Sequence, residues 1–121
     1  MARILVIDDD QAIRGTIRKI LERSGHEVRE AEDGVEGLKL FREDRPDLVV
    51  TDLVMPRKEG IETIIEIRAE CPDVRILAVS GAETSVPAGR LFDAEALGAD
   101  ASLAKPFTVD QLRKAVAALL G

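Results

Sequence analysis

The chain has 121 residues, of which 45% are hydrophobic and 33% charged, and its formal net charge at pH 7 is −6. This size and composition are typical of one globular domain, and no apolar stretch is long enough to span a bilayer. Binding to nucleic acid relies on cationic contacts to phosphates, so the negative charge argues against a nucleic-acid partner. The start of the chain lacks a signal-peptide pattern, which predicts a cytoplasmic protein.

Short apolar runs alternate with segments of helical periodicity along the whole chain. The runs predict five β-strands, at residues 3–7, 26–31, 48–51, 75–79 and 101–104. After each run, apolar residues recur every three or four positions, as in helices that bury one face. The residues that mark these helices are Ile13, Ile17, Ile20 and Leu21, then Val35, Leu38 and Phe41, then Ile61, Ile64, Ile65 and Ile67, then a less regular segment within residues 87–97, and finally Val109, Leu112, Val116 and Leu119.

Five strand–helix units joined by short connections predict an α/β domain with a parallel sheet covered on both faces. Right-handed crossovers leave few ways to wind such units. We expect the flavodoxin-like (βα)5 order 2-1-3-4-5, because it makes the most apolar strands, residues 3–7 and 48–51, central. The prediction is one doubly wound, five-stranded domain over residues 1–121.

Four of the five predicted strands are followed by a residue suited to binding phosphate or a metal ion. Asp8 and Asp9 follow the first strand, Asp52 the third, Ser80 the fourth and Lys105 the fifth. The carboxyl ends of parallel strands meet at one edge, where open α/β sheets bind ligands. We therefore expect these five side chains to converge.

The strand order makes the first and third strands neighbours, so Asp8 and Asp9 should lie about one strand spacing, ~5 Å, from Asp52. Three carboxylates that close repel one another, so either some stay protonated or a cation lies among them. Mg²⁺ suits a site with few carboxylates, because it keeps several of its waters. Lys105 has the length to reach Asp52 from the fifth strand, and Ser80 offers a hydroxyl on the strand between. This set favours phosphoryl transfer to Asp52.

At this point the chain resembles a bacterial response-regulator receiver domain of the stand-alone, chemotaxis-receiver-like kind, over essentially its full length. Each short motif is weak alone, but their order, each at a strand end, makes the set specific. The matching residues are the pair Asp8-Asp9, Asp52-Leu-Val-Met-Pro56 with Gly60, Ser80-Gly81, Gly98-Ala99-Asp100 and Lys105-Pro106-Phe107.

The resemblance implies a role for each acid. Asp52 would accept a phosphoryl group from the phosphohistidine of a sensor histidine kinase or of a phosphotransfer protein. Asp9 would bind Mg²⁺ directly and Asp8 through water, and the Asp52 carboxylate and the backbone carbonyl of Val54 would be the other protein ligands. Asp10, one position beyond the matched pair, is expected to cap the next helix instead.

The same resemblance implies that Lys105 pairs with the phosphoryl group, that Ser80 moves toward it on activation, and that the Lys105–Pro106 bond is cis. The protein would be a signalling switch that changes its partner-binding surface. It would not be an enzyme acting on other molecules, although it would catalyse its own phosphorylation and dephosphorylation. Its downstream protein partner is not indicated, no membrane partner is expected, and a weak homodimer is left open.

One departure from the family pattern concerns switching. Receivers usually carry an aromatic residue three positions before the lysine, where this chain has Ser102, and the chain contains no Tyr or Trp. The usual aromatic rotamer change therefore cannot operate here. We expect the signal to pass through displacement of residues 81–90 instead.

Three alternatives to a phosphorylation switch concern the same residues. A haloacid-dehalogenase-type phosphatase needs a second acid two positions after its aspartate nucleophile, where this chain has Val54. A flavodoxin-type redox carrier needs a hydroxyl-rich phosphate loop after the first strand, where residues 8–10 are aspartates that would repel phosphate. An adaptor that keeps the receiver fold and works unphosphorylated stays open.

Overall fold

The computed structural model of the chain describes residues 2–53, 60–81 and 98–121. One sheet holds β1 (Arg3–Ile7), β2 (Glu27–Ala31), β3 (Leu48–Asp52), β4 (Arg75–Gly81) and β5 (Ala101–Lys105). All strand pairs are parallel, and the order is β2-β1-β3-β4-β5. The helices are α1 (Gln11–Arg23), α2 (Gly34–Glu43), α3 (Gly60–Glu70) and α5 (Val109–Leu120). The predicted α/β fold and strand order are confirmed, while the helix predicted within residues 87–97 lies outside the described residues.

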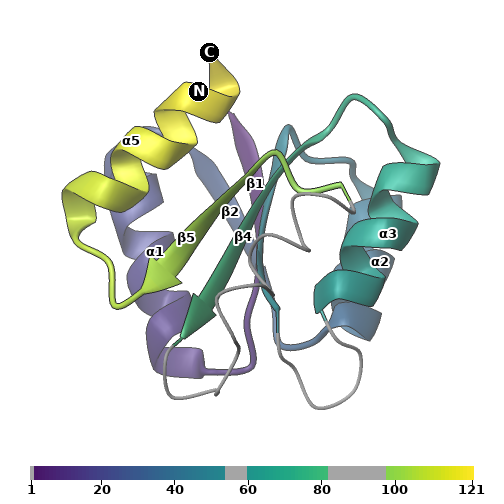
Figure 1. Cartoon of the computed structure of the whole chain (residues 1–121), viewed down its shortest axis with the longest axis horizontal. Helices are drawn as coiled ribbons and strands as arrows, with labels where there is room; N and C mark the ends of the chain where they lie inside the picture. Colours follow the sequence, from purple (N-terminus) through teal and green to yellow (C-terminus); the bar gives the residue numbers. More distant parts are fainter. Residues whose placement is uncertain (1, 54–59, 82–97) are drawn as a thin grey trace.

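The helices cover both faces of the sheet, with α1 and α5 on one face and α2 and α3 on the other (Figure 1). Successive strand residues point to opposite faces. On β1, Ile4 and Val6 therefore join the core under α1 and α5, whereas Leu5 and Ile7 join the core under α2 and α3. Every residue of β3 is buried, and so is every residue of β1 except Arg3, as expected of central strands. None of the described helices is long and apolar enough to cross a bilayer.

The helices that follow β1 and β5 each begin with a side-chain cap. At α1, the Asp10 carboxylate accepts hydrogen bonds from the backbone N–H groups of Ala12 (2.9 Å) and Ile13 (3.2 Å). At α5, the Thr108 hydroxyl accepts from the N–H of Gln111 (3.1 Å), whose side chain accepts from the N–H of Thr108 (2.8 Å). The predicted cap at Asp10 is confirmed, and Thr108 with Gln111 forms a capping box at α5. They fix short turns after β1 and β5.

Three strands extend one or two residues beyond the ends that the apolar pattern predicts. β3 ends at Asp52, β4 at Gly81 and β5 at Lys105, because backbone pairing continues through these polar residues. In the register, Asp52 is opposite Val79 and Lys105 is opposite Gly81. The backbone of the candidate site is therefore held by the sheet itself.

Gly37 of α2 packs directly against β1, and Gly37→Ala is expected to lower the free energy of unfolding by about 1–3 kcal/mol through overpacking. A Cβ atom at this position would lie 2.5 Å from Cδ1 and 2.9 Å from Cγ1 of the fully buried Ile7. Gly15→Ala in α1 is the matched control, because a Cβ there meets nothing within 4 Å. This control should raise the stability by about 0.5–1 kcal/mol. Urea unfolding measures both, and equal stabilisation by the two alanines would contradict the close packing.

Candidate functional site

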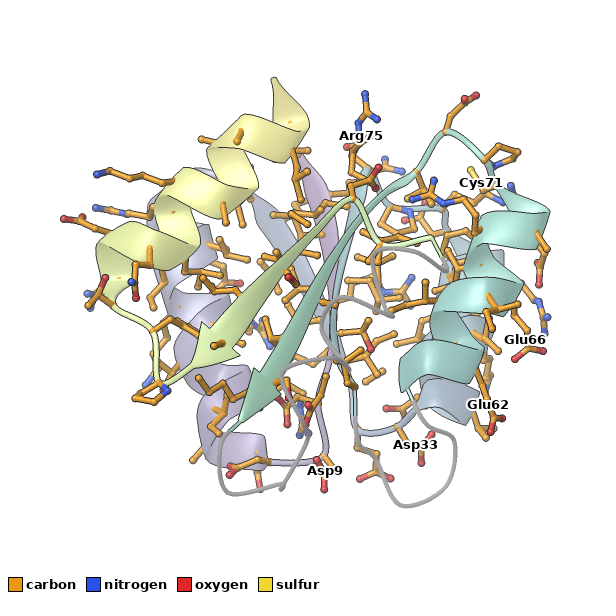
Figure 2. All side chains as sticks on the ribbon, in the orientation of Figure 1. Asp9, Asp33, Glu62, Glu66, Cys71 and Arg75 are labelled. Atoms are coloured by element: carbon orange, nitrogen blue, oxygen red, sulfur yellow. The ribbon has the colours of Figure 1, made fainter. Side chains whose placement is uncertain are left out.

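The two central strands bring three carboxylates together at the carboxyl edge of the sheet. In the register, Ile7, the last residue of β1, is opposite Thr51 of β3. The residues that follow them are Asp8, just after β1, and Asp52, at the end of β3. One oxygen from each of Asp8, Asp9 and Asp52 lies within 4.8 Å of the others. Asp8 and Asp52 are only 1% and 3% exposed, whereas Asp9 is open to solvent at the edge of the molecule (Figure 2).

Lys105 reaches this cluster from β5. Its ammonium group donates a hydrogen bond to Asp8 Oδ2 at 2.8 Å and lies 3.5 Å from Asp52 Oδ2. The sequence predicted a contact with Asp52, and the structure adds the shorter one with Asp8. Burial alone lowers the pKa of Lys105, but the hydrogen bond to Asp8 and the charges of Asp52 and Asp8 together raise it above the ordinary value. The ammonium group therefore stays charged at neutral pH.

Asp52 and Ser80 occupy neighbouring strands of the same edge. Asp52 Oδ1 accepts a hydrogen bond from the N–H of Leu53 at 2.8 Å, and Oδ2 is the oxygen near Lys105. Ser80, which is 5% exposed, lies on β4 opposite Ala104, the residue before Lys105. Since β4 separates β3 from β5, Ser80 lies on the strand between Asp52 and Lys105.

Of the remaining residues singled out in the sequence, the structure describes some and not others. The Lys105–Pro106 peptide bond is cis. Ser102, at the position where receivers usually carry an aromatic residue, is partly exposed on β5, opposite Ala78. Val54, whose carbonyl was predicted to bind metal, lies outside the described residues, and so do residues 82–90 of the segment predicted to carry the signal.

The charges and donor atoms of the cluster fit a hard divalent cation. The three carboxylates exceed the single ammonium of Lys105 by two negative charges, and every ligand atom they offer is oxygen. Mg²⁺ prefers such oxygen ligands and needs only one or two carboxylates besides its waters. Because both Asp8 oxygens already accept hydrogen bonds, from the N–H of Asp10 and from Lys105, the exposed Asp9 is the acid best placed for direct binding.

Sequence reasoning missed one residue at this edge. Arg14 of α1 donates a hydrogen bond from Nη1 to the backbone carbonyl of Asp8 at 2.7 Å. The periodicity of α1 assigns Arg14 only to its polar side. Its place one turn into the helix that follows the acids was the sole signal available.

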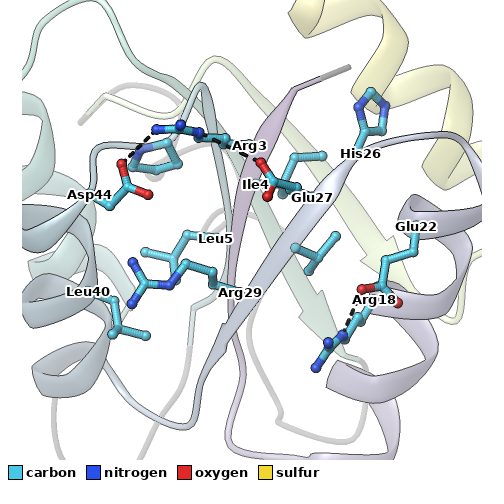
Figure 3. Close-up of a pocket in the computed structure, with 12 residues that line it drawn as sticks. Arg3, Ile4, Leu5, Arg18, Glu22, His26, Glu27, Arg29, Leu40 and Asp44 are labelled. Carbon is cyan, nitrogen blue, oxygen red and sulfur yellow. Dashed lines mark hydrogen bonds and ion pairs between the residues drawn. The ribbon is translucent and has the colours of Figure 1, made fainter.

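A pocket of about 450 Å³ lies beside the first halves of β1 and β2, at the end of the sheet opposite Asp52 (Figure 3). Its arginines are engaged by neighbouring acids. Arg3 pairs with Asp44 at 2.8 Å, and Arg18 pairs with Glu22 at 3.0 Å. These pairings leave the carboxyl edge as the better candidate for phosphate chemistry.

The sequence is similar to those of known response regulators. The family model for the response regulator receiver domain matches residues 4–117. Response regulator MprA of Mycobacterium sp. (strain KMS) is 41% identical over 118 residues, which cover 98% of this chain and 50% of that protein. The MprA protein of Mycobacterium ulcerans is 40% identical over the same shares. The chain thus spans about half the length of the curated relatives that it matches.

Solved structures of receiver domains are similar to this chain in both fold and sequence. A response regulator receiver domain protein from Clostridium thermocellum is 33% identical with a TM-score of 0.90, over 99% of this chain and 94% of that chain. A CheY-like receiver domain protein from Methanospirillum hungatei is 29% identical with a TM-score of 0.92, over the same shares. The receiver domain of NtrX from Brucella abortus is 29% identical with a TM-score of 0.89, over 97% of both chains.

Proposed function

The chain belongs to the family of response regulator receiver domains of two-component signalling, and on this basis we propose that it is a phosphorylation-dependent switch. Asp52 accepts a phosphoryl group from the phosphohistidine of a sensor histidine kinase or a phosphotransfer protein. The observation that carries this proposal is a buried ammonium group, Lys105, in contact with two buried carboxylates, Asp8 and Asp52, at the carboxyl edge of the sheet.

The geometry of Asp52 supports one course for the proposed transfer step. Oδ1 is held by the N–H of Leu53, so Oδ2, on the side of Lys105, attacks phosphorus. The bond between phosphorus and the imidazole nitrogen breaks, the electron pair stays on that nitrogen, and an acyl phosphate forms. The Lys105 ammonium group then pairs with a phosphoryl oxygen, and Ser80 donates its hydroxyl hydrogen to another.

The cation that this proposal requires is Mg²⁺. Asp9 and Asp52 would bind it directly, Asp8 would bind it through water, and the backbone carbonyl of Val54 would be the further protein ligand. When bound, Mg²⁺ neutralises charge on the phosphoryl oxygens during transfer. The excess of two negative charges in the cluster and its all-oxygen donor set support this assignment.

Receiver domains are regulatory modules and do not act as enzymes on other molecules. We propose that residues 1–121 form one such module in the cytoplasm. It catalyses its own phosphorylation and dephosphorylation and binds a downstream protein through a surface that phosphorylation changes. A displaced segment at residues 81–90 transmits the change, because Ser102 replaces the usual aromatic residue.

The proposal is tested by labelling with a small phosphodonor, acetyl phosphate, followed by intact-mass spectrometry. The wild type should gain one phosphoryl group in Mg²⁺ and none in excess EDTA, and Asp52→Asn should gain none in either. Asp10→Asn is the matched control, because asparagine caps helices as well as aspartate does, and it should be labelled like the wild type. A wild-type chain that stays unlabelled with Mg²⁺ would instead favour the unphosphorylated adaptor.

A further inference from the structure

Asp8 is held at four points. Its N–H donates to the carbonyl of Ala31 on β2 at 3.1 Å, and its own carbonyl accepts from Arg14 Nη1 at 2.7 Å. Its side chain accepts from the N–H of Asp10 at 2.9 Å and from Lys105 at 2.8 Å. Among the described residues, Arg14 is the one whose side chain binds the backbone carbonyl of Asp8, which is bonded to the nitrogen of Asp9.

The Arg14 guanidinium is itself fixed by an acid on β2. Its Nε donates to Glu30 Oε1 at 2.9 Å, and the other oxygen of Glu30 accepts from Arg18 Nη1 at 2.8 Å. The side chains of Arg14 and Glu30 are 14% and 24% exposed, whereas Arg18 is 45% exposed. Arg18 also pairs with Glu22, one turn further along α1 (Figure 3). Arg14 is therefore the inner member of this network and the one that touches the acidic edge.

The contact at the Asp8 carbonyl has a direct geometric effect on Asp9. That carbonyl belongs to the planar peptide group whose other end is the nitrogen of Asp9, so fixing its direction fixes the plane from which Asp9 extends. A hydrogen bond from a guanidinium group at 2.7 Å is short and charge-assisted. Because Glu30 pairs with the same guanidinium, the positive charge of Arg14 is kept from competing with a cation for Asp9.

We propose that Arg14 and Glu30 form a brace that positions the Asp8–Asp9 turn for binding the divalent cation. Arg14 is a positioning residue in this inference, which rests on the proposed function. The hydrogen bond from Arg18, aided by the one from Arg14, lowers the pKa of Glu30 against the effect of burial, so the brace keeps its charge at neutral pH.

The test measures the affinity for Mg²⁺ by isothermal titration calorimetry. Arg14→Ala should raise the dissociation constant for Mg²⁺ on the order of tenfold, as loss of an outer-shell partner typically does. Arg14→Lys should also weaken binding, because an ammonium group cannot bridge Glu30 and the Asp8 carbonyl as the planar fork does. Arg18→Ala is the matched control, since it removes an arginine from the same helix and the same Glu30 but not from Asp8. It should change the constant by less than about twofold.

Two further measurements separate positioning from a general loss of structure. Saturating Mg²⁺ should restore the acetyl phosphate labelling rate of Arg14→Lys to within about twofold of the wild type, because only the cation affinity is changed. Glu30→Gln should weaken Mg²⁺ binding, and adding it to Arg14→Ala should cause no further loss, since both act through one contact.

Unchanged Mg²⁺ affinity in both Arg14 variants would overturn the brace, as would an equal loss in Arg18→Ala. A labelling rate for Arg14→Lys that stays low at saturating Mg²⁺ would also overturn it. These outcomes leave the proposed function intact as long as the wild type binds Mg²⁺ and is labelled. A wild type that binds no Mg²⁺ would overturn the metal assignment and the brace together.

Discussion

Lys105→Met is expected to slow the phosphorylation of Asp52 by about two orders of magnitude, and to lower the free energy of unfolding by about 3–5 kcal/mol without divalent cations. Methionine has a similar length but no charge. The variant therefore loses the ammonium group that lies 2.8 Å from Asp8 and 3.5 Å from Asp52. Both acids are almost fully buried, so water cannot replace that charge.

Urea unfolding in EDTA and in Mg²⁺ measures the stability part of this prediction. Adding Mg²⁺ should raise the free energy of unfolding more for Lys105→Met than for the wild type. The reason is that Asp8 and Asp52 without a neighbouring ammonium group gain more from a bound cation. The pKa of Lys105 is raised in the folded chain, so its stabilisation is fully present below the ordinary lysine pKa. It is lost only as the pH rises through the raised value. Lys114→Met, on the exposed side of α5, is the control and should unfold at the wild-type urea concentration. An unchanged midpoint for Lys105→Met in EDTA would contradict the ion-pair argument.

Arg68→Ala is expected to lower the free energy of unfolding by about 3 kcal/mol, because one guanidinium group satisfies several backbone carbonyls at once. Nε and Nη2 of Arg68 donate to the carbonyl of Gly98 at 3.0 and 2.6 Å. Nη1 donates to the carbonyls of Pro72 and Val74, both at 2.7 Å, and Nη2 also donates to Asp100 at 2.8 Å. The side chain thus ties the end of α3 to the turns before β4 and β5.

Differential scanning calorimetry checks this expectation, and a loss of this size corresponds to a fall in Tm of roughly 10–20 °C for a domain near 100 residues. Arg68→Lys should recover little, because an ammonium group cannot make this fan of hydrogen bonds. The control is Arg42→Ala. Arg42 pairs with Glu70 on the surface at 2.6 Å, and exposed pairs of this kind contribute little. Equal effects of the two alanine substitutions would show that the carbonyl contacts of Arg68 are not what stabilises the fold.

The fold could be predicted because its causes are local and periodic. The fully apolar runs identified β1 and β3 as central strands, and handedness left few alternatives to the observed order. The cap at Asp10 was predictable for the same reason, since it lies at a change from strand to helical periodicity. The strand ends were placed one or two residues short, because polarity marks where an apolar run stops but not where backbone pairing stops.

The site was predictable in its members but not in its detailed contacts. Strand order alone brings Asp8, Asp52 and Lys105 to one edge, yet it does not say which acid the lysine reaches first. That choice depends on rotamers and on the N–H of Asp10, which occupies the other Asp8 oxygen. The hydrogen-bond acceptors of the arginine side chains were harder still to predict from the sequence. The long side chain of Arg14 reaches a carbonyl six residues back along the chain, a contact that no periodicity encodes.

All residues of β3 are buried, which limits how far Asp52 itself can move when it is modified. Segments whose side chains and backbone hydrogen bonds are both buried open only rarely. Asp52 is the last residue of this strand, and the next residue, Leu53, is buried and donates its N–H to the carbonyl of Val79 at 3.1 Å. The candidate phosphoacceptor Asp52 is therefore attached to a rigid, buried strand. Any rearrangement that follows modification has to occur in the parts of the chain that surround the sheet, while the residue that is modified stays nearly still.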